Sequence, residues 1–392
     1  MNNNYLVLVV VLLLTLAACN TINELRFQAR SGFASDTVTT VPFRYVKQLI
    51  VVDAQINNSK ETGSFIFDTG AFQSKVEYHL SEELGLSTVT KRNNGTAQGI
   101  KREIEITSLD SMKMSSACFL NIAAGRLKYD AKSYSPCVAE AGIIGANLIK
   151  LAHWKIDYEQ KTMKVSKVPF VVADKEQLQQ IPFSTSFLSG VPKVDIEIEG
   201  RLIENVIFDL GYNGGLVVPF EYAKHFPSKS TQTLIDQSTA GIFGSNRDTL
   251  IVKDLNVKLG AYEAKIPVEF SSLNKALIGN DFLEHFTIYL NYEDNTVLLR
   301  PNSSITIDKS KTFIPGILND SLWIVNRTNP KISLKIGDTL RSVNGRQPKT
   351  MFTSHCDYFL NSAKIWDAEV LTVETLAGNE IQISLNPSDA KD

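Results

Sequence analysis

The sequence is poor in features that mark several protein classes. Its 392 residues include only four Cys and five His, and 40 basic and 42 acidic side chains leave a net charge of −2. So few Cys cannot build a small disulfide-stapled fold, and a near-zero charge argues against a nucleic-acid-binding protein, so we expect no nucleic-acid partner. The His residues are widely spaced and lack zinc-site spacing. We therefore expect no metal and no cofactor.

Known nucleotide-binding and hydrolase motifs are also missing. The chain has no phosphate-binding loop, no Gly-x-Gly-x-x-Gly after a strand and no Gly-x-Ser-x-Gly turn. The sequence does not decide whether a catalytic Ser-His-Asp triad is assembled from residues far apart in the chain. The hydrophobic fraction of 43% excludes disorder over most of the chain. At about 150 residues per domain, the length predicts two or three domains.

The one long apolar run lies at the N-terminus. Residues 5–18 are almost wholly apolar, too few to span a bilayer but suited to a signal-peptide core, and Cys19 follows. The ending Leu-Ala-Ala-Cys resembles the lipobox of bacterial lipoproteins, although no Lys or Arg precedes the run. The resemblance implies removal of residues 1–18, acylation of Cys19 and a tether at 19–40. The protein would then be lipid-anchored to a membrane of the bacterial cell envelope, in an unspecified leaflet; the alternative is an uncleaved anchor.

An envelope location permits disulfides among the remaining cysteines. Cys118 and Cys137 lie close together in the sequence and are a candidate pair, which would leave Cys356 over. The alternative is three unpaired thiols.

The chain repeats itself. Ile-Phe-Asp-Thr-Gly at 66–70 recurs as Ile-Phe-Asp-Leu-Gly at 207–211, and Gly-Ile-Ile-Gly at 142–145 recurs as Ala-Leu-Ile-Gly at 276–279. Further blocks recur in the same order, at offsets between 134 and 142 residues. Changes in loop length between two copies would produce this drift. The sequence therefore predicts an internal duplication.

The duplication divides the chain into two homologous lobes. We place the first copy at 41–168 and the second copy at 181–301, with a linker at 169–180. Apolar and alternating runs of strand length, such as 51–56 and 194–198, are followed by turn residues in both copies. Both copies are therefore expected to be β-structured.

Each copy carries one Asp-x-Gly tripeptide, beginning at Asp68 and at Asp209. One such tripeptide alone is typical of a turn. Two carboxylates brought together by lobe symmetry would repel by roughly 5 kcal/mol at about 3 Å, so the pair would hold one proton over a wide acid range. A water between them would meet a base and an acid at once, which is the chemistry of peptide hydrolysis without a metal. Asp68 and Asp209 are the catalytic candidates, with Asp68 as base.

The first-copy motif at 66–71, with the block at 142–148, resembles the retropepsin-like aspartic proteases. The doubling resembles the two-lobed, pepsin-type arrangement within one chain. The resemblance implies an all-β fold of two retropepsin-like β-barrel lobes in pseudo-two-fold arrangement, a peptide or protein substrate in the cleft, and support of the pair by Thr69, Gly70 and Gly211. It also implies β-hairpin flaps, with the candidate tip glycines Gly95, Gly99, Gly241 and Gly244.

The second copy departs from the family pattern. The family has Thr or Ser after each Asp, and Thr69 fits where Leu210 does not; Tyr212 stands where Ala or Ser is usual. Leu210 packed beneath Asp209 would raise the pKa of that carboxyl. The first hypothesis is a monomeric aspartic endopeptidase with an asymmetric pair. The alternative is a non-catalytic peptide-binding lipoprotein, and a third is a homodimer in which two Asp68 residues meet.

The C-terminal segment, residues 305–387, resembles a PDZ domain. Gly-Asp at 337–338 is followed by a strand and an Asn-Gly turn at 344–345. The resemblance implies a small β-rich domain that binds a peptide tail by strand addition, with groove candidates Gly316, Ile317 and Leu318. The alternative is a β-domain that packs on the lobes and binds nothing.

Overall fold

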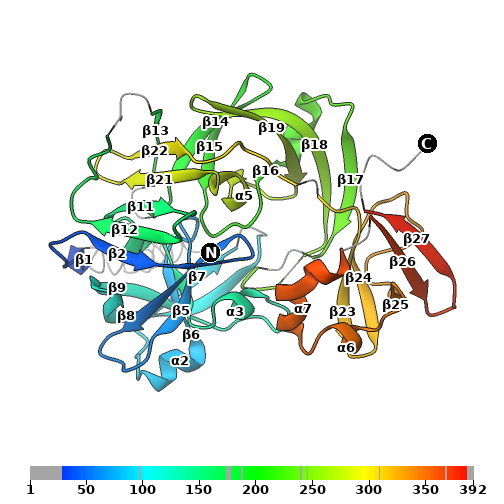
Figure 1. The fold of residues 1–392 in the computed structure, drawn as a ribbon. Helices are drawn as coiled ribbons and strands as arrows, with labels where there is room; N and C mark the ends of the chain where they lie inside the picture. The colour runs from blue at the N-terminus through cyan, green and yellow to red at the C-terminus, as the bar shows by residue number, and fades with distance from the viewer. Residues whose placement is uncertain are drawn as a thin grey trace, which may run out of the picture.

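The computed structural model describes residues 29–96, 99–173, 178–186, 189–238, 241–244, 246–308, 310–366 and 369–385. The predicted signal peptide and Cys19 lie outside these residues, as do part of the tether, part of the linker and part of each candidate flap tip. Strands predominate and helices are short, which confirms the all-β class (Figure 1). Among the described residues, no helix has the length and apolar character needed to cross a membrane.

Three sheets contain the named strands. A nine-stranded sheet belongs to the first copy and its N-terminal flank, in the order β1-β9-β6-β10-β5-β4-β8-β7 with β3 beside β4. Its strands are β1 (Gly32–Phe33), β3 (Arg44–Val46), β4 (Leu49–Ile56), β5 (Gly63–Phe67), β6 (Ser74–Glu77), β7 (Thr90–Gly95), β8 (Lys101–Met114), β9 (Ala117–Leu127) and β10 (Gly142–Ile144).

A six-stranded sheet joins the two copies, in the order β13-β22-β21-β11-β12-β2. Its central pair, β11 and β21, takes one strand from each copy. Its strands are β2 (Thr39–Pro42), β11 (His153–Asp157), β12 (Thr162–Ser166), β13 (Gln180–Pro182), β21 (Phe286–Asn291) and β22 (Thr296–Pro301).

A twelve-stranded sheet runs from the second copy into the C-terminal segment, in the order β14-β15-β20-β16-β19-β18-β17-β24-β25-β26-β27 with β23 beside β24. Its strands are β14 (Lys193–Ile198), β15 (Arg201–Phe208), β16 (Leu216–Pro219), β17 (Thr231–Asp236), β18 (Asp248–Leu259), β19 (Tyr262–Ser271), β20 (Leu277–Ile278), β23 (Ile314–Asn319), β24 (Leu322–Thr328), β25 (Thr339–Val343), β26 (Val370–Thr375) and β27 (Glu380–Ser384).

The helices are single turns or little more. They are α2 (Tyr78–Glu83), α3 (Ser135–Val138), α4 (Ala146–Ile149), η2 (Phe220–His225), α5 (Asn280–Leu283), α6 (Pro348–Met351), α7 (His355–Asn361) and η3 (Ser362–Ile365). Local chemistry explains their ends: the Glu77 side chain accepts a hydrogen bond from the Leu80 amide and caps α2, and Ser354 caps α7 through the Asp357 amide.

Strand pairing repeats along the chain as the sequence duplication predicts. In the first copy, β10 lies between parallel β5 and antiparallel β6, and β6 pairs in parallel with β9. In the second copy, β20 lies between parallel β15 and antiparallel β16, and β16 pairs in parallel with β19. In β14, every second residue is buried: Val194, Ile196 and Ile198 all face the core. This alternation is the pattern expected of a strand with one buried face.

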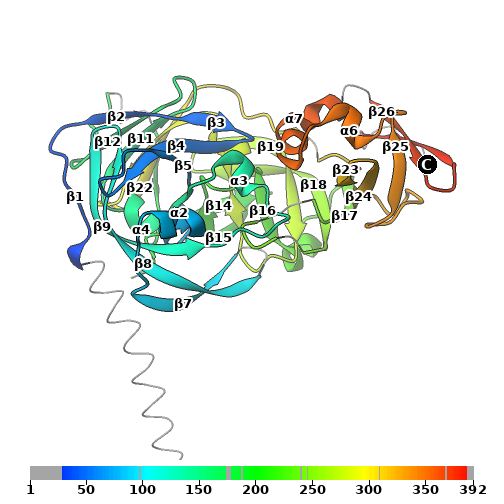
Figure 2. The ribbon, with the colours of Figure 1, turned by 90° about the horizontal axis from the view of Figure 1, so that it is seen from below.

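One apolar core unites the two copies, and a second lies within the C-terminal segment. The first core includes Phe67 and Trp154 from the first copy and Phe208 and Phe286 from the second. The second core is built around Trp323 and its neighbours in β24, β25, β26 and α7. The C-terminal segment therefore has an interior of its own, and Figure 2 shows it to one side of both copies.

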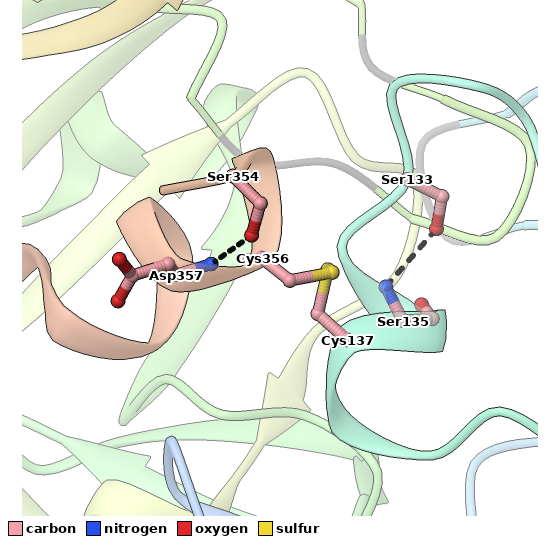
Figure 3. The surroundings of a disulfide bond; sticks show 6 residues. All are labelled: Ser133, Ser135, Cys137, Ser354, Cys356 and Asp357. Carbon is pink, nitrogen blue, oxygen red and sulfur yellow. Dashed lines mark hydrogen bonds between the residues drawn. A yellow bond between two sulfur atoms is a disulfide. The ribbon is translucent and has the colours of Figure 1, made fainter. Parts of the chain in front are cut away.

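Several contacts hold the C-terminal segment against the two copies, and two of them lie on opposite sides of the segment. The end of β17 pairs with the end of β24, and there Arg327 Nε donates to Asp236 Oδ1 at 2.7 Å in a buried ion pair. On the other side, a disulfide joins Cys137 of α3 to Cys356 of α7, residues separated by 219 positions (Figure 3). Tyr134 stacks on His355 and Phe359 beside it, with ring centroids 4.2 and 4.5 Å apart.

The predicted pairing of Cys118 with Cys137 is wrong, and Cys118 is a free thiol. Cys118 stands near the start of β9, which runs on to Leu127 as an extended strand. At about 3.4 Å per residue, this strand carries the chain roughly 30 Å from Cys118 before α3 begins. Closeness in sequence therefore did not mean closeness in space.

Candidate active site

The two Asp-x-Gly loops occupy matching places in the fold. Asp68 follows β5, and its amide donates to the Ile144 carbonyl at 2.9 Å. Asp209 follows β15, and its amide donates to the Ile278 carbonyl at 2.9 Å. Each carboxyl group is thus presented at the end of a strand whose parallel neighbour, β10 or β20, carries the repeated Gly-containing block.

The structure brings Asp68 and Asp209 together. A Cβ built on Gly211 would lie 2.4 Å from Asp68 Oδ1, and one built on Gly70 would lie 2.3 Å from Asp209 Oδ2. Each loop therefore places bare glycine backbone against the carboxyl group of the other copy, an approach that no larger residue permits. The two carboxyl groups are close enough that each shifts the pKa of the other.

Backbone amides orient both carboxyl groups. The Ala71 amide donates to Asp68 Oδ1 at 2.7 Å, and the Gly211 amide donates to Asp209 Oδ1 at 2.9 Å. These donors favour the ionised form of each group and hold it in one orientation.

The electrostatic environments of the pair differ. Asp209 is only 8% exposed, and burial together with the charge of Asp68 raises its pKa well above the usual range. Asp68 is partly exposed; burial raises its pKa, while the positive charge of Lys75 lowers it. This difference favours a shared proton on Asp209 and a negative charge on Asp68.

Thr69 binds the two loops together from one side. Its hydroxyl donates to the Phe208 carbonyl at 2.6 Å and accepts from the Leu210 amide at 2.9 Å. Leu210 is fully buried in the core that the two copies share. The expected support by Thr69, Gly70 and Gly211 is therefore present geometrically, with one hydroxyl in place of two.

An asparagine holds the second loop from below, and sequence reasoning missed it. Asn280 Nδ2 donates to the Leu210 carbonyl at 2.8 Å and to the Gln48 carbonyl at 2.7 Å. Tyr158 Oη donates to Asn280 Oδ1 at 2.7 Å. One feature of the sequence could have indicated this role. Asn280 directly follows the repeated Ile-Gly, a position from which its side chain reaches the neighbouring Asp-x-Gly loop.

Both glycine-rich stretches that were predicted as flap tips lie at the ends of hairpins. Gly95 ends β7, and Gly99 adopts a φ of +78° in the turn before β8. Gly241 and Gly244 bridge each other between β17 and β18.

The tip between β17 and β18 rests on the first copy. Phe243 is 3% exposed and packs in an apolar cluster with Ile104, Ile106 and Leu127. The Asp130 amide donates to the Ile242 carbonyl at 3.1 Å. Arg102 Nη2 donates to the Phe243 carbonyl at 3.2 Å. The second hairpin therefore reaches across to the other copy.

The groove candidates of the C-terminal segment lie in β23. Among the described strands, β23 pairs with β24 alone, so no described strand lies along its other edge. Leu318 is 48% exposed, Ile317 is partly buried, and Gly316 packs against the side chain of Asn326. Tyr358 of α7 donates to the Pro315 carbonyl, which places this helix beside β23.

The described part of the chain contains no group of three His, Cys, Asp or Glu side chains that could hold a metal ion. No protein-family model matches the chain, and no curated protein matches it in sequence. The geometry of the carboxyl pair is therefore the main observation from which a function can be argued.

Proposed function

We propose that the chain is an aspartic-type endopeptidase of two retropepsin-like lobes, with Asp68 and Asp209 as the catalytic pair. The main support is a contact made in both directions: the glycine of each Asp-x-Gly tripeptide packs against the carboxyl group of the other copy. A pair of turns with no joint function has no need for such an approach.

The pair would act through one water molecule. Asp68, as the ionised partner, takes a proton from the water as it attacks the peptide carbonyl, and protonated Asp209 donates to the carbonyl oxygen. The proton on Asp209 and the negative charge on Asp68 are the arrangement that their surroundings favour. Collapse of the tetrahedral intermediate then breaks the C–N bond and passes a proton to the leaving amine.

The same arrangement supports a monomer, because one chain supplies both carboxyl groups. It also weakens the homodimer hypothesis, since Asp68 already has a partner within its own chain. We further propose that Cys19 carries a lipid and that the C-terminal segment is a PDZ-like domain, whose β23 edge would take an extended peptide tail.

The first test is removal of each carboxylate in turn. The full chain with Asp68→Asn or Asp209→Asn is incubated between about pH 3 and 7 with a diverse peptide mixture, and products are identified by mass spectrometry. We expect loss of cleavage by a factor of about 10³ or more in both variants, since neither half of the pair works alone. Asp110→Asn, an exposed carboxylate in β8, is the matched control. Unchanged cleavage by Asp209→Asn would remove Asp209 from the mechanism.

A second candidate function is non-catalytic peptide binding, which Leu210 and Tyr212 favour as departures from the family pattern. A statine-type peptide separates the two, because it imitates the tetrahedral transition state. An endopeptidase binds it far more tightly than the matching substrate peptide, and Asp68→Asn abolishes the difference. A binding protein would hold both peptides alike.

A further inference from the structure

A lysine is buried in the first copy next to the carboxyl pair. Lys75, in β6, is only 4% exposed, whereas lysine is almost never fully buried without a partner. Its Nζ donates to the main-chain carbonyl of Gln73 at 3.1 Å. Burial lowers the pKa of this ammonium group, and the negative charge of Asp68 raises it. Burial of an ammonium group is costly, so its presence here calls for a specific reason.

The matching position in the second copy is apolar. In the first copy, Ile143 of β10 pairs with Lys75, and in the second copy the equivalent Leu277 of β20 pairs with Val217. Lys75 and Val217 are therefore equivalent residues. Val217 is 2% exposed and packs with Ile207 and Leu277 in an apolar cluster. At this pair of equivalent positions, the first copy thus has a cation and the second copy does not.

The charged groups on elements that pack against β6 are engaged elsewhere or lie in solvent. On β9, Arg126 forms ion pairs with Glu82 and Glu105. On α2, His79 and Glu83 are exposed, and β10 and α4 carry no charged side chain.

Two further charged groups lie nearby and have other contacts. Glu77, at the end of β6, caps α2 through the Leu80 amide. Arg92, from β7, lies over the ring of Phe72, 4.1 Å from its centroid. Asp68, with Asp209 behind it, is therefore the acidic group toward which the charge of Lys75 acts.

We propose that Lys75 is a positioning residue for the carboxyl pair, which keeps Asp68 ionised and the shared proton on Asp209. This inference rests on the proposed endopeptidase function. With Lys75 positive, Asp68 negative and Asp209 protonated, the three groups together are neutral. Neutrality reduces the cost of burying them in one place.

The sign of the expected effect follows from the charge. A neighbouring cation favours the carboxylate, so removal of the Lys75 ammonium raises the pKa of Asp68. The acid limb of the pH profile of kcat/KM reports this group as the base of the free enzyme. That limb should move to higher pH in Lys75→Met by about one unit, the order of shift expected when a neighbouring opposite charge is removed.

The experiment compares four variants of the full chain. Lys75→Met removes the charge at nearly constant volume, Lys75→Gln does so with a polar group, and Lys75→Arg retains it. Val217→Met is the matched control at the equivalent position. We expect a displaced acid limb in the first two and a profile close to that of the unsubstituted protein in the other two. A variant that merely loosened the structure would lower activity without displacing the limb.

A second measurement does not depend on activity. The pKa of Asp68 is followed by carboxyl ¹³C NMR, with its signal assigned by its absence in Asp68→Asn. A rise in Lys75→Met or Lys75→Gln supports the inference even if no peptide is cleaved, which would overturn only the proposed function. An unmoved pKa in a folded variant, or an unmoved acid limb in an active one, overturns the role of Lys75 and leaves the endopeptidase intact.

Discussion

Thr69 and Leu210 stand at equivalent positions in the two copies, and the Leu210 amide donates to the Thr69 hydroxyl at 2.9 Å. The same hydroxyl donates to the Phe208 carbonyl at 2.6 Å. One side chain therefore satisfies two main-chain groups of the opposite copy, and Leu210 fills the buried space that a second hydroxyl would occupy. The second copy can lose its hydroxyl because the first copy supplies the bridge.

Substitution of Thr69 by Val should break this bridge. The buried Leu210 amide and Phe208 carbonyl would both lose their partner, at a cost of about 1–3 kcal/mol each. We expect the free energy of unfolding, measured by urea titration, to fall by about 2–4 kcal/mol. Thr69→Ser retains the hydroxyl and is the control. Equal destabilisation by Ser and Val would mean that packing of the methyl group, not the bridge, is responsible.

Gly211→Ala should separate the carboxyl pair. The new Cβ would lie 2.1 Å from Asp68 Cγ, so one of the two loops must move. A displacement of about 1 Å at reacting groups can cost roughly 100-fold in rate, and we expect at least this loss in peptide cleavage. Gly32→Ala, where the new Cβ meets no atom within 4 Å, should leave cleavage unchanged. An active Gly211→Ala variant would argue against catalysis by the pair.

Asp209→Asn should stabilise the protein at neutral pH. Because the pKa of Asp209 is raised in the folded state, the contribution of Asp209 to stability is greatest below the unfolded pKa of about 3.9 and declines as pH rises towards the folded pKa. Asn does not titrate and escapes this loss. Urea titrations at pH 3, 5 and 7 should give a difference between variant and wild type that grows with pH. A constant difference across this range would contradict the raised pKa.

The disulfide between Cys137 and Cys356 should contribute about 3–5 kcal/mol under oxidising conditions, since it closes a loop of more than two hundred residues. Cys356→Ser should lower the free energy of unfolding by that amount, as should reduction of the wild type. Cys118→Ser is the control, because Cys118 is a free thiol. Full stability of Cys356→Ser would show that non-covalent contacts, such as those of Tyr134 and Lys47 with Phe359, are enough to hold α7.

Phe243→Ala should release the second hairpin tip from the first copy. Phe243 is buried against Ile104, Ile106 and Leu127, and its removal leaves only the partly buried Ile242 as an apolar contact of the described part of the tip. We expect faster amide hydrogen exchange at residues 241–244 and at Asp130, whose amide donates to Ile242. Phe220→Ala, at a side chain that is 45% exposed, should leave exchange at these positions unchanged. Unaltered exchange in Phe243→Ala would mean that main-chain hydrogen bonds alone hold the tip.

The duplication and the meeting of Asp68 with Asp209 were predictable, because both follow from the order of repeated blocks. Asp68 and Asp209 end strands with the same neighbours, so equivalent sequence places them equivalently. Asn280 and Lys75 were not predicted, since each differs from its counterpart in the other copy. Leu210 and Tyr212 also break the repeat, but they lie in or next to the Asp-x-Gly motif, where the two copies were compared residue by residue.

The cysteine pairing was beyond prediction for another reason. Cys356 belongs to a segment outside the repeat, and nothing in the sequence states on which side of the two copies that segment lies. The pairing of β17 with β24 has the same origin: it depends on the free edge of a hairpin, which is a property of the assembled fold.

The attachment of the C-terminal segment to both copies has a mechanical consequence. Its α7 is covalently tied to one copy, while its β24 shares hydrogen bonds and the Asp236–Arg327 pair with the last residues of β17, just before the loop that carries Phe243. If the two copies moved apart to admit a peptide chain, the C-terminal segment would be pulled at both of these attachments. Tension applied at β23 by a bound tail would in turn pass through β24 to the loop that carries Phe243.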